Sequence, residues 1–159
     1  GLPIGAIGGS RAVMENLTPI GKVFHAGTLA GNPLATAAGL AALNELTQDV
    51  YMELGARARA LSTLLRDACL SAGIVAQFPV VGTLVGAFFG PNTPTNFDEA
   101  KQTDEKMYAR LFHAMLAEGV ALAPGAYEAL FVGLGHTDSV MQQLAERTER
   151  AAHAAVRAQ

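Results

Sequence analysis

Stretches with helical spacing alternate with short apolar runs along most of this chain, and this alternation constrains the fold more than any other feature. Helices are predicted over about residues 33–46, 49–72, 103–118 and 138–157. Short strands are predicted over 74–76, 83–89 and 120–123. Residues 1–32 are rich in Gly, Pro and Thr and are expected to be strand and loop material. No repeat is detectable, so the pattern predicts a mixed α/β or α+β fold.

The ends of these helices have specific signals. Asn32 can cap free backbone N–H groups, and Pro33 suits the first helical position because its missing donor has no partner there. Gly73 and Gly119 are predicted to end the helices that precede them. Thr137 or Asp138 is predicted to cap the last helix. On the second helix, Arg57, Arg59 and Arg66 are predicted to mark the solvent side.

Composition excludes several classes of protein. Of the 159 residues, 50% are hydrophobic and 16% charged, which allows a sizeable core and argues against disorder. The net charge is −3 and the basic residues form no patch, so nucleic acid is not an expected partner. No apolar stretch is long enough to span a membrane. The single cysteine, Cys69, is predicted to be a buried, inert thiol, which fits a reducing, cytoplasmic compartment.

A Gly-Thr turn before the first long helix is one candidate site. Gly27, Thr28 and Gly31 precede the Asn32-Pro33 helix start. Backbone N–H groups, a hydroxyl and a helix N-terminus can together hold a phosphate. The same residues also suit a plain structural turn, and their spacing alone leaves both interpretations open.

Two further side chains lie where they could serve a site. Glu128 is in an apolar neighbourhood, where an ionised carboxylate needs a partner or water. It is either a site residue or a loop residue that points outward. His136 is either a ligand or acid/base group, or a hydrogen-bonded residue of a capping turn. His25 stands beside the Gly-Thr turn and could touch a ligand.

Metal and lysine chemistry have no support in the residue spacing. The histidines and the cysteine show no metal-ligand pattern, so no metal site is predicted. The three lysines, Lys22, Lys101 and Lys106, lie in polar, loop-like or helix-start contexts. A lysine that forms a covalent bond to a carbonyl must be desolvated, and none of these contexts suggests that.

Three motifs in order carry a resemblance to a known family. Residues 1–9 are GLPIGAIGG, residues 25–35 are HAGTLAGNPLA, and residues 123–131 are APGAYEALF, with His136-Thr137 following. In these motifs the chain resembles the pyridoxal-phosphate enzymes called class-III aminotransferases, and within them the aminomutases. The resemblance covers essentially all 159 residues, as the carboxyl-terminal part of a longer chain.

The resemblance implies an architecture and site residues. It implies a fold-type-I α/β transferase, in which residues 1–48 end a large cofactor-binding domain and residues 49–159 form a small α+β carboxyl-terminal domain. It implies a homodimer with pyridoxal or pyridoxamine 5'-phosphate. Gly27 and Thr28 would bind the cofactor phosphate of the neighbouring subunit, and Glu128 would orient the substrate's amino group.

The resemblance also implies a reaction. Glutamate 1-semialdehyde, a small amino aldehyde, would be converted to 5-aminolevulinate for tetrapyrrole synthesis. The family's cofactor lysine would precede Gly1, so the isolated chain is expected to be inactive, with no catalytic residue of its own. Gly125 stands where the family often has Ser. The alternatives are another class-III aminotransferase, or a non-catalytic module derived from the small domain.

Overall fold

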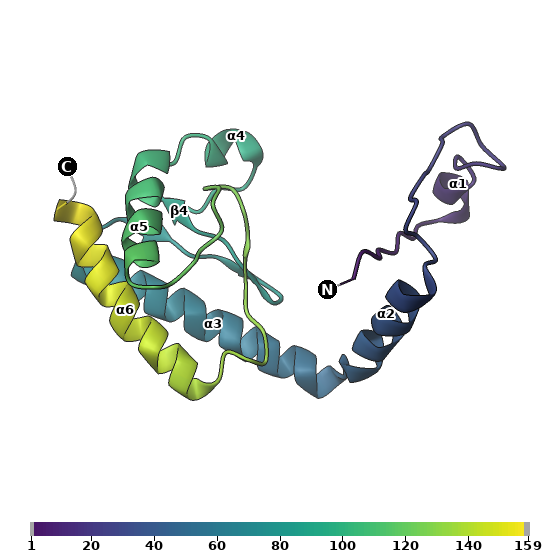
Figure 1. Ribbon diagram of the computed structural model, residues 1–159. Coiled ribbons are helices and arrows are strands. Elements are labelled where there is room, and N and C mark those ends of the chain that lie inside the picture. Colours follow the sequence, from purple (N-terminus) through teal and green to yellow (C-terminus); the bar gives the residue numbers. More distant parts are fainter. Residues whose placement is uncertain (1, 158–159) are drawn as a thin grey trace. The chain divides into compact units, whose positions relative to one another are not determined.

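The computed structural model describes residues 2–157, which form two compact units. One unit ends at Thr47 and the other begins at Gln48. Figure 1 gives the elements of both, and each unit is described below by itself. The division lies next to the predicted boundary between residues 48 and 49. The assignment of these ranges to a large and a small domain stays a prediction.

The first unit contains a short helix and a longer one. Helix α1 spans Arg11–Met14, and α2 spans Pro33–Glu45. Asn32 caps α2 as predicted, because its side-chain oxygen accepts hydrogen bonds from the N–H groups of Leu34 at 3.0 Å and Ala35 at 3.2 Å. The predicted start of this helix is therefore confirmed.

Apolar side chains of the first unit are largely exposed. Among residues 2–47 only Ala35 is buried. Large apolar side chains along α2 are instead exposed to solvent. Leu34, Leu40 and Leu43 are 75%, 61% and 67% exposed. A helix that is apolar on all sides is typical of one that other protein surfaces surround.

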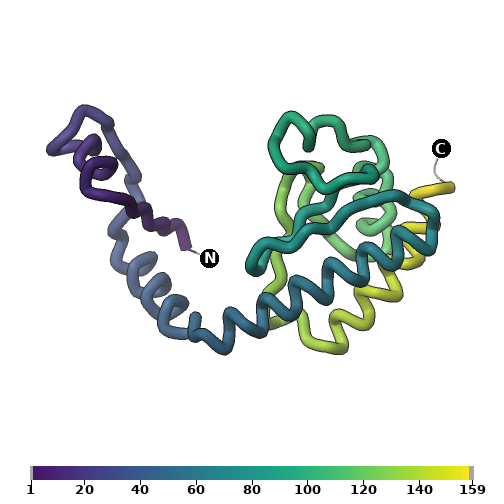
Figure 2. Tube along the Cα trace, turned by 180° about the vertical axis from the view of Figure 1, so that it is seen from behind, coloured from purple at the N-terminus to yellow at the C-terminus, as the bar shows by residue number. Residues whose placement is uncertain are grey.

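Three helices cover two small sheets in the second unit. Helix α3 spans Gln48–Ser71, α5 spans Glu105–Ala117 and α6 spans Asp138–Arg157. A short helix, α4, spans Phe97–Ala100. Helix α6 packs against both α3 and α5, and the strands lie on the other side of α3, as Figures 1 and 2 show from opposite sides.

The strands are short and antiparallel. They are β1 (Ala76–Gln77), β2 (Val80–Val81), β3 (Leu84–Val85), β4 (Phe88–Phe89) and β5 (Leu130–Phe131). Strands β1 and β4 form one sheet, with Ala76 opposite Phe89. Strands β2, β3 and β5 form the other, with Val85 opposite both Val80 and Leu130. Strand β3 is thus the central strand of this second sheet.

The core contains both small and large side chains. Helix α6 contributes Thr148, Ala151, Ala152 and Ala155, all with no exposed surface. These small residues let the helix approach its neighbours closely. The largest fully buried side chains of the chain come from several elements: Leu65, Leu111, Met115, Val85, Thr148 and Cys69. The buried alanines of α6 therefore serve helix packing.

The four long helices agree with their predicted ranges to within two residues, whereas the short helices α1 and α4 were not predicted and the strands differ. Residues 83–89, predicted as one strand, form β3 and β4 of different sheets. Residues 120–123 form no strand, so that prediction is wrong. Arg57 was also predicted to lie on the solvent side, but its side chain is only 18% exposed. No helix among residues 2–157 is long and apolar enough to cross a membrane.

Burial of Cys69 makes a chemical prediction. Cys69 is on α3, and its thiol lies in the hydrophobic core of the second unit. Burial raises the pKa of this thiol from 9.0 to about 12. At pH 8 the folded chain should therefore react with a thiol reagent about a thousandfold more slowly than an unfolded one. The comparison is the same reaction in concentrated guanidinium chloride. Similar rates in both solutions would contradict a buried thiol.

The same raised pKa sets a pH dependence. The folded state keeps the Cys69 proton at a pH where the unfolded state loses it. The contribution of this thiol to stability is therefore complete below pH 9 and is lost as the pH rises toward 12.

Candidate functional site

Glu128 lies at the end of a tight turn that holds its carboxylate. The Gly125 N–H donates to Glu128 Oε1 at 2.9 Å. In return the Glu128 N–H donates to the Gly125 carbonyl oxygen at 3.2 Å. No partner for Glu128 Oε2 is present among the described residues. One carboxylate oxygen is therefore fixed by the backbone, and the other can accept from a ligand.

Aromatic side chains connect this turn to the helices beside it. The Tyr127 hydroxyl donates to Glu105 Oε1 at the start of α5, and this hydrogen bond raises the pKa of Tyr127. The Tyr127 ring packs edge-on against Phe97 of α4, with 5.6 Å between ring centres. Lys101 Nζ lies 5.2 Å from the centre of the Phe97 ring. Through Tyr127, the turn is thus connected to α4 and to the start of α5.

Tyr108 connects the chain before the turn to the core. It is a buried residue of α5, and its hydroxyl donates to the carbonyl oxygen of Ala123. Burial raises the pKa of Tyr108, and the negative charge of Glu128 raises it further. The phenol thus stays protonated near neutral pH, as a donor to Ala123 requires.

Glu128 lines a cavity of about 750 Å³ in the second unit. Most of the lining is apolar and comes from α3, β5, α6 and the segment before the turn. The polar lining side chains are those of Glu128, His136, Gln143 and Arg147. A hollow that is mainly apolar with a few polar groups is typical of a small-molecule site.

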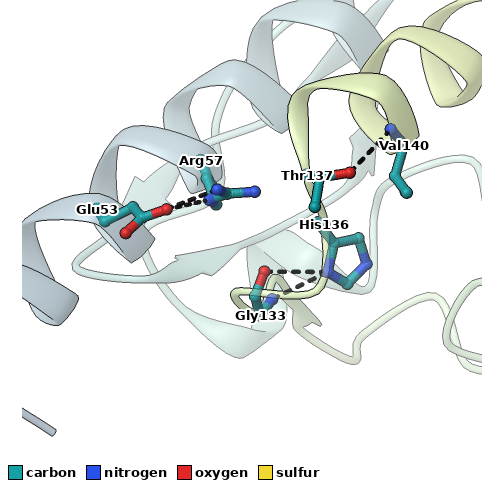
Figure 3. A network of polar contacts seen from close by, with 6 residues as sticks. All are labelled: Glu53, Arg57, Gly133, His136, Thr137 and Val140. Atoms are coloured by element: carbon teal, nitrogen blue, oxygen red, sulfur yellow. Dashed lines mark hydrogen bonds and ion pairs between the residues drawn. The ribbon is translucent and has the colours of Figure 1, made fainter.

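His136 lies in the turn before α6, as Figure 3 shows. The Gly133 N–H donates to His136 Nδ1 at 3.0 Å. The Gly133 carbonyl oxygen lies 3.3 Å from the same nitrogen, so the Gly133 backbone offers Nδ1 both a donor and an acceptor. Thr137 Oγ1 accepts from the Val140 N–H at 3.4 Å. The prediction that Thr137 or Asp138 caps the last helix is confirmed at Thr137, and His136 has the hydrogen-bonded place in the turn that was one of its two interpretations.

Arg57 and Glu53 of α3 appear in the same view (Figure 3). Arg57 Nη2 donates to Glu53 Oε1 at 2.5 Å, and Nε donates to the same oxygen at 3.1 Å. Arg57 Nη1 is buried and has no partner among the described residues. This ion pair explains why an arginine can lie on a partly buried face.

The Gly-Thr turn of the first unit has donors available. Residues 28–31 form a turn in which the Ala30 N–H donates to the Gly27 carbonyl oxygen at 2.9 Å. Thr28 is exposed, and neither its hydroxyl nor its N–H has a partner in the described part of the chain. The N–H of Leu29 likewise has no acceptor there. These donors, followed by the N-terminus of α2, fit a phosphate group.

The predicted site residues thus fall in both units. Glu128 and His136 line one cavity of the second unit. Gly27, Thr28 and His25 belong to the first unit, where His25 is exposed. Within residues 2–157 no group of His, Cys, Asp and Glu could hold a metal ion.

Sequence reasoning missed Tyr108 and Arg147. Tyr108 lies on the apolar face of α5, so the sequence pattern indicates an ordinary core residue. Its hydroxyl donates to Ala123, fifteen residues later, which no local pattern indicates. For Arg147, the hydrophobic spacing of the last helix predicts a place on its polar side. Its Nη1 in fact donates to the Glu118 carbonyl oxygen at 2.5 Å.

Known proteins similar to this chain agree in family. The model of the family described as aminotransferase class-III matches residues 1–150. A glutamate-1-semialdehyde 2,1-aminomutase of Desulfosudis oleivorans is 44% identical over 155 residues, covering 97% of this chain and 35% of that protein. The protein of the same name from Acidovorax sp. is 48% identical over 139 residues, covering 87% and 32%. The chain spans about a third of the length of these curated relatives.

Solved structures agree in fold. A β-phenylalanine aminotransferase of Variovorax paradoxus matches with a TM-score of 0.70 and 27% identity, over 89% of this chain and 33% of that one. A glutamate-1-semialdehyde aminomutase of Pseudomonas aeruginosa, in complex with PMP, matches with a TM-score of 0.68 and 23% identity, over 82% and 30%. The mixed α/β fold, the sequence relatives and the match to nearly the whole chain lead to one conclusion: this chain belongs to the class-III aminotransferase family.

Proposed function

We propose that this chain is the carboxyl-terminal part of a pyridoxal-phosphate-dependent aminomutase that converts glutamate 1-semialdehyde to 5-aminolevulinate. The observation that carries the proposal is the identity of 38–48% to aminomutases over most of the chain. The reaction is an isomerisation, in which the amino group leaves the carbon beside the aldehyde and the aldehyde carbon receives an amino group. The carboxylate of Glu128 suits the amino group of such a substrate. The N–H and hydroxyl donors around Thr28 suit the phosphate of the cofactor.

Each unit has a separate part in the proposed chemistry. The Thr28 hydroxyl and the nearby N–H groups would hold the cofactor phosphate, in the neighbouring subunit of a homodimer. Glu128 Oε2 would accept a hydrogen bond from the substrate's amino group and so orient it. The cofactor, when bound, supplies an electron sink for the carbon that exchanges the amino group. The lysine that carries the cofactor would precede Gly1.

The proposed architecture is that of a fold-type-I transferase. Residues 1–48 would end the large cofactor-binding domain, and residues 49–159 would form the small domain. The exposed apolar side chains of α2 support this, because a longer chain or a second subunit would cover them. We place the enzyme in the cytoplasm.

An intact mass after borohydride reduction tests the proposal. Reduction fixes pyridoxal phosphate to the lysine that holds it, so both chain length and cofactor are measured together. A mass well above 16.5 kDa with one pyridoxyl-phosphate increment, together with 5-aminolevulinate formed without added keto acid, is the expected result. A requirement for an external keto acid would instead indicate another aminotransferase. A bare 16.5 kDa chain would indicate a module without this chemistry.

Removing the Thr28 hydroxyl should weaken cofactor binding. Thr28→Val loses one hydrogen bond to a charged phosphate, so we expect the dissociation constant of pyridoxamine 5'-phosphate to rise about tenfold or more. The measurement is equilibrium dialysis on the dimeric enzyme. Thr28→Ser keeps the hydroxyl and should bind nearly as well as the parent. Equal binding by the Val and Ser variants would exclude the hydroxyl as a phosphate ligand.

A further inference from the structure

The turn that carries Glu128 has few connections to the rest of the second unit. Two of its hydrogen bonds join Gly125 and Glu128 to each other, within the turn. Ala126 packs one methyl group against the core. Between residues 124 and 129, the hydrogen bonds and ring contacts that reach other parts of the described chain all involve Tyr127. The residue before Glu128 thus makes the specific contacts that fix this turn from outside.

The two contacts of Tyr127 differ in how easily water can replace them. Its hydroxyl donates to Glu105 in an exposed hydrogen bond, which contributes little because water can take the place of either partner. Its ring lies edge-on against Phe97, with 5.6 Å between ring centres and 74° between the ring planes. This is a preferred geometry for aromatic pairs, and water cannot reproduce it. The ring contact is therefore the stronger restraint on the turn.

Phe97 is itself held in place by the ends of α4. Asn96 Oδ1 accepts from the Glu99 N–H at 3.0 Å, and Glu99 Oε2 accepts from the Thr95 N–H at 2.8 Å, so the start of this short helix is capped from both sides. Ala100 at its end is buried. Phe97 is 64% exposed, so its ring contributes little to filling the core. Its packing against Tyr127 is the specific contact that the structure gives it with the turn.

We propose that Phe97 is a positioning residue, whose ring packs against Tyr127 and holds the turn so that Glu128 Oε2 is free to accept from the substrate's amino group. This inference rests on the proposed function of Glu128. It adds a residue of α4 to the determinants of amino-substrate binding, although Phe97 acts through Tyr127. The aromatic ring at position 127 carries the effect, and the hydroxyl of Tyr127 is secondary.

The first test measures the turn itself and needs no activity. The N–H groups of Gly125 and Glu128 are both hydrogen-bonded within the turn, so hydrogen exchange of the peptide containing residues 124–129, followed by mass spectrometry on the intact enzyme, shows how often the turn opens. Phe97→Leu should speed this exchange about two- to tenfold, and Phe97→Tyr, which keeps a ring, should restore the parent rate. Tyr51→Leu is the matched control, because Tyr51 is 49% exposed and makes no ring contact in the described part of the chain. Unchanged exchange in Phe97→Leu would overturn the proposal.

The second test is a double-mutant cycle on the Michaelis constant for glutamate 1-semialdehyde. Phe97→Leu should raise KM about two- to tenfold with a smaller change in kcat, because the carboxylate that orients the substrate is held less firmly. Phe97→Tyr should restore KM. Tyr127→Phe loses only the hydroxyl and should raise KM less than Phe97→Leu does. In a Glu128→Ala background, Phe97→Leu should have no further effect.

The outcomes separate this inference from the proposed function. If Glu128→Ala raises KM and Phe97→Leu does not, Phe97 has no positioning role and Glu128 keeps its own. If neither substitution changes KM, the role of Glu128 in substrate binding is wrong and the inference falls with it. An equal effect of Phe97→Leu in both backgrounds would show that it acts independently of Glu128, which overturns the inference. An effect of Tyr127→Phe as large as that of Phe97→Leu would assign the restraint to the hydroxyl and overturn it as well.

Discussion

Replacing Leu65 by Ala is expected to lower the free energy of unfolding by about 2–5 kcal/mol. Leu65 of α3 is 1% exposed and belongs to the core of the second unit, where α3 packs against α6 and the strands. Removal of its side chain takes away apolar contacts and leaves a cavity that close-packed helices fill only in part. Urea denaturation followed by circular dichroism measures the change.

Leu70→Ala on the same helix is the matched control. Leu70 is 73% exposed, so the identical chemical change should alter stability by no more than about 0.5 kcal/mol. Equal losses at both positions would mean that α3 does not bury the face that the structure assigns to it.

The helices of this chain could be predicted because their signals are local. Asn32 and Gly73 act within a turn of the helix that each one limits, through a side-chain acceptor and through a φ of +74°. Cys69 was predicted as buried because its neighbours on α3 are apolar, and this is confirmed. Hydrophobic spacing and caps are thus sufficient where a helix is long.

The strands could not be predicted because their partners are distant or absent. Val85 pairs with both Val80 and Leu130, and the second of these lies on the far side of α5 in the sequence. The segment 120–123 is apolar enough for a strand, yet the Ala123 carbonyl oxygen accepts from the Tyr108 hydroxyl instead of from a neighbouring strand. A side chain here replaces the ladder on which a strand prediction depends.

The candidate site was predictable in its residues but not in its geometry. Glu128 stands out in the sequence as a carboxylate among apolar residues. Its carboxylate accepts from the Gly125 N–H, and Tyr127 of the same turn donates to Glu105. A backbone hydrogen bond within a turn and a contact across 22 positions leave no periodic signal in a sequence.

Gly119→Ala should destabilise the second unit by about 2–4 kcal/mol, which combines left-handed strain with the loss of a hydrogen bond. Gly119 ends α5 with a φ of +77°, and a Cβ there would lie 2.9 Å from Arg147 Nη1. That nitrogen donates to the Glu118 carbonyl oxygen and ties the end of α5 to α6. The added methyl group would therefore displace the guanidinium that joins the two helices.

Gly73→Ala separates the two causes. Gly73 has a φ of +74°, almost the same as Gly119, but a Cβ there would meet nothing within 4 Å. Its loss of stability should reflect backbone strain alone, about 1–2 kcal/mol. The difference between the two variants then measures what the Arg147 contact contributes to joining α5 and α6. If the two losses are equal, Arg147 can move without cost, and the junction depends instead on the buried small residues of α6.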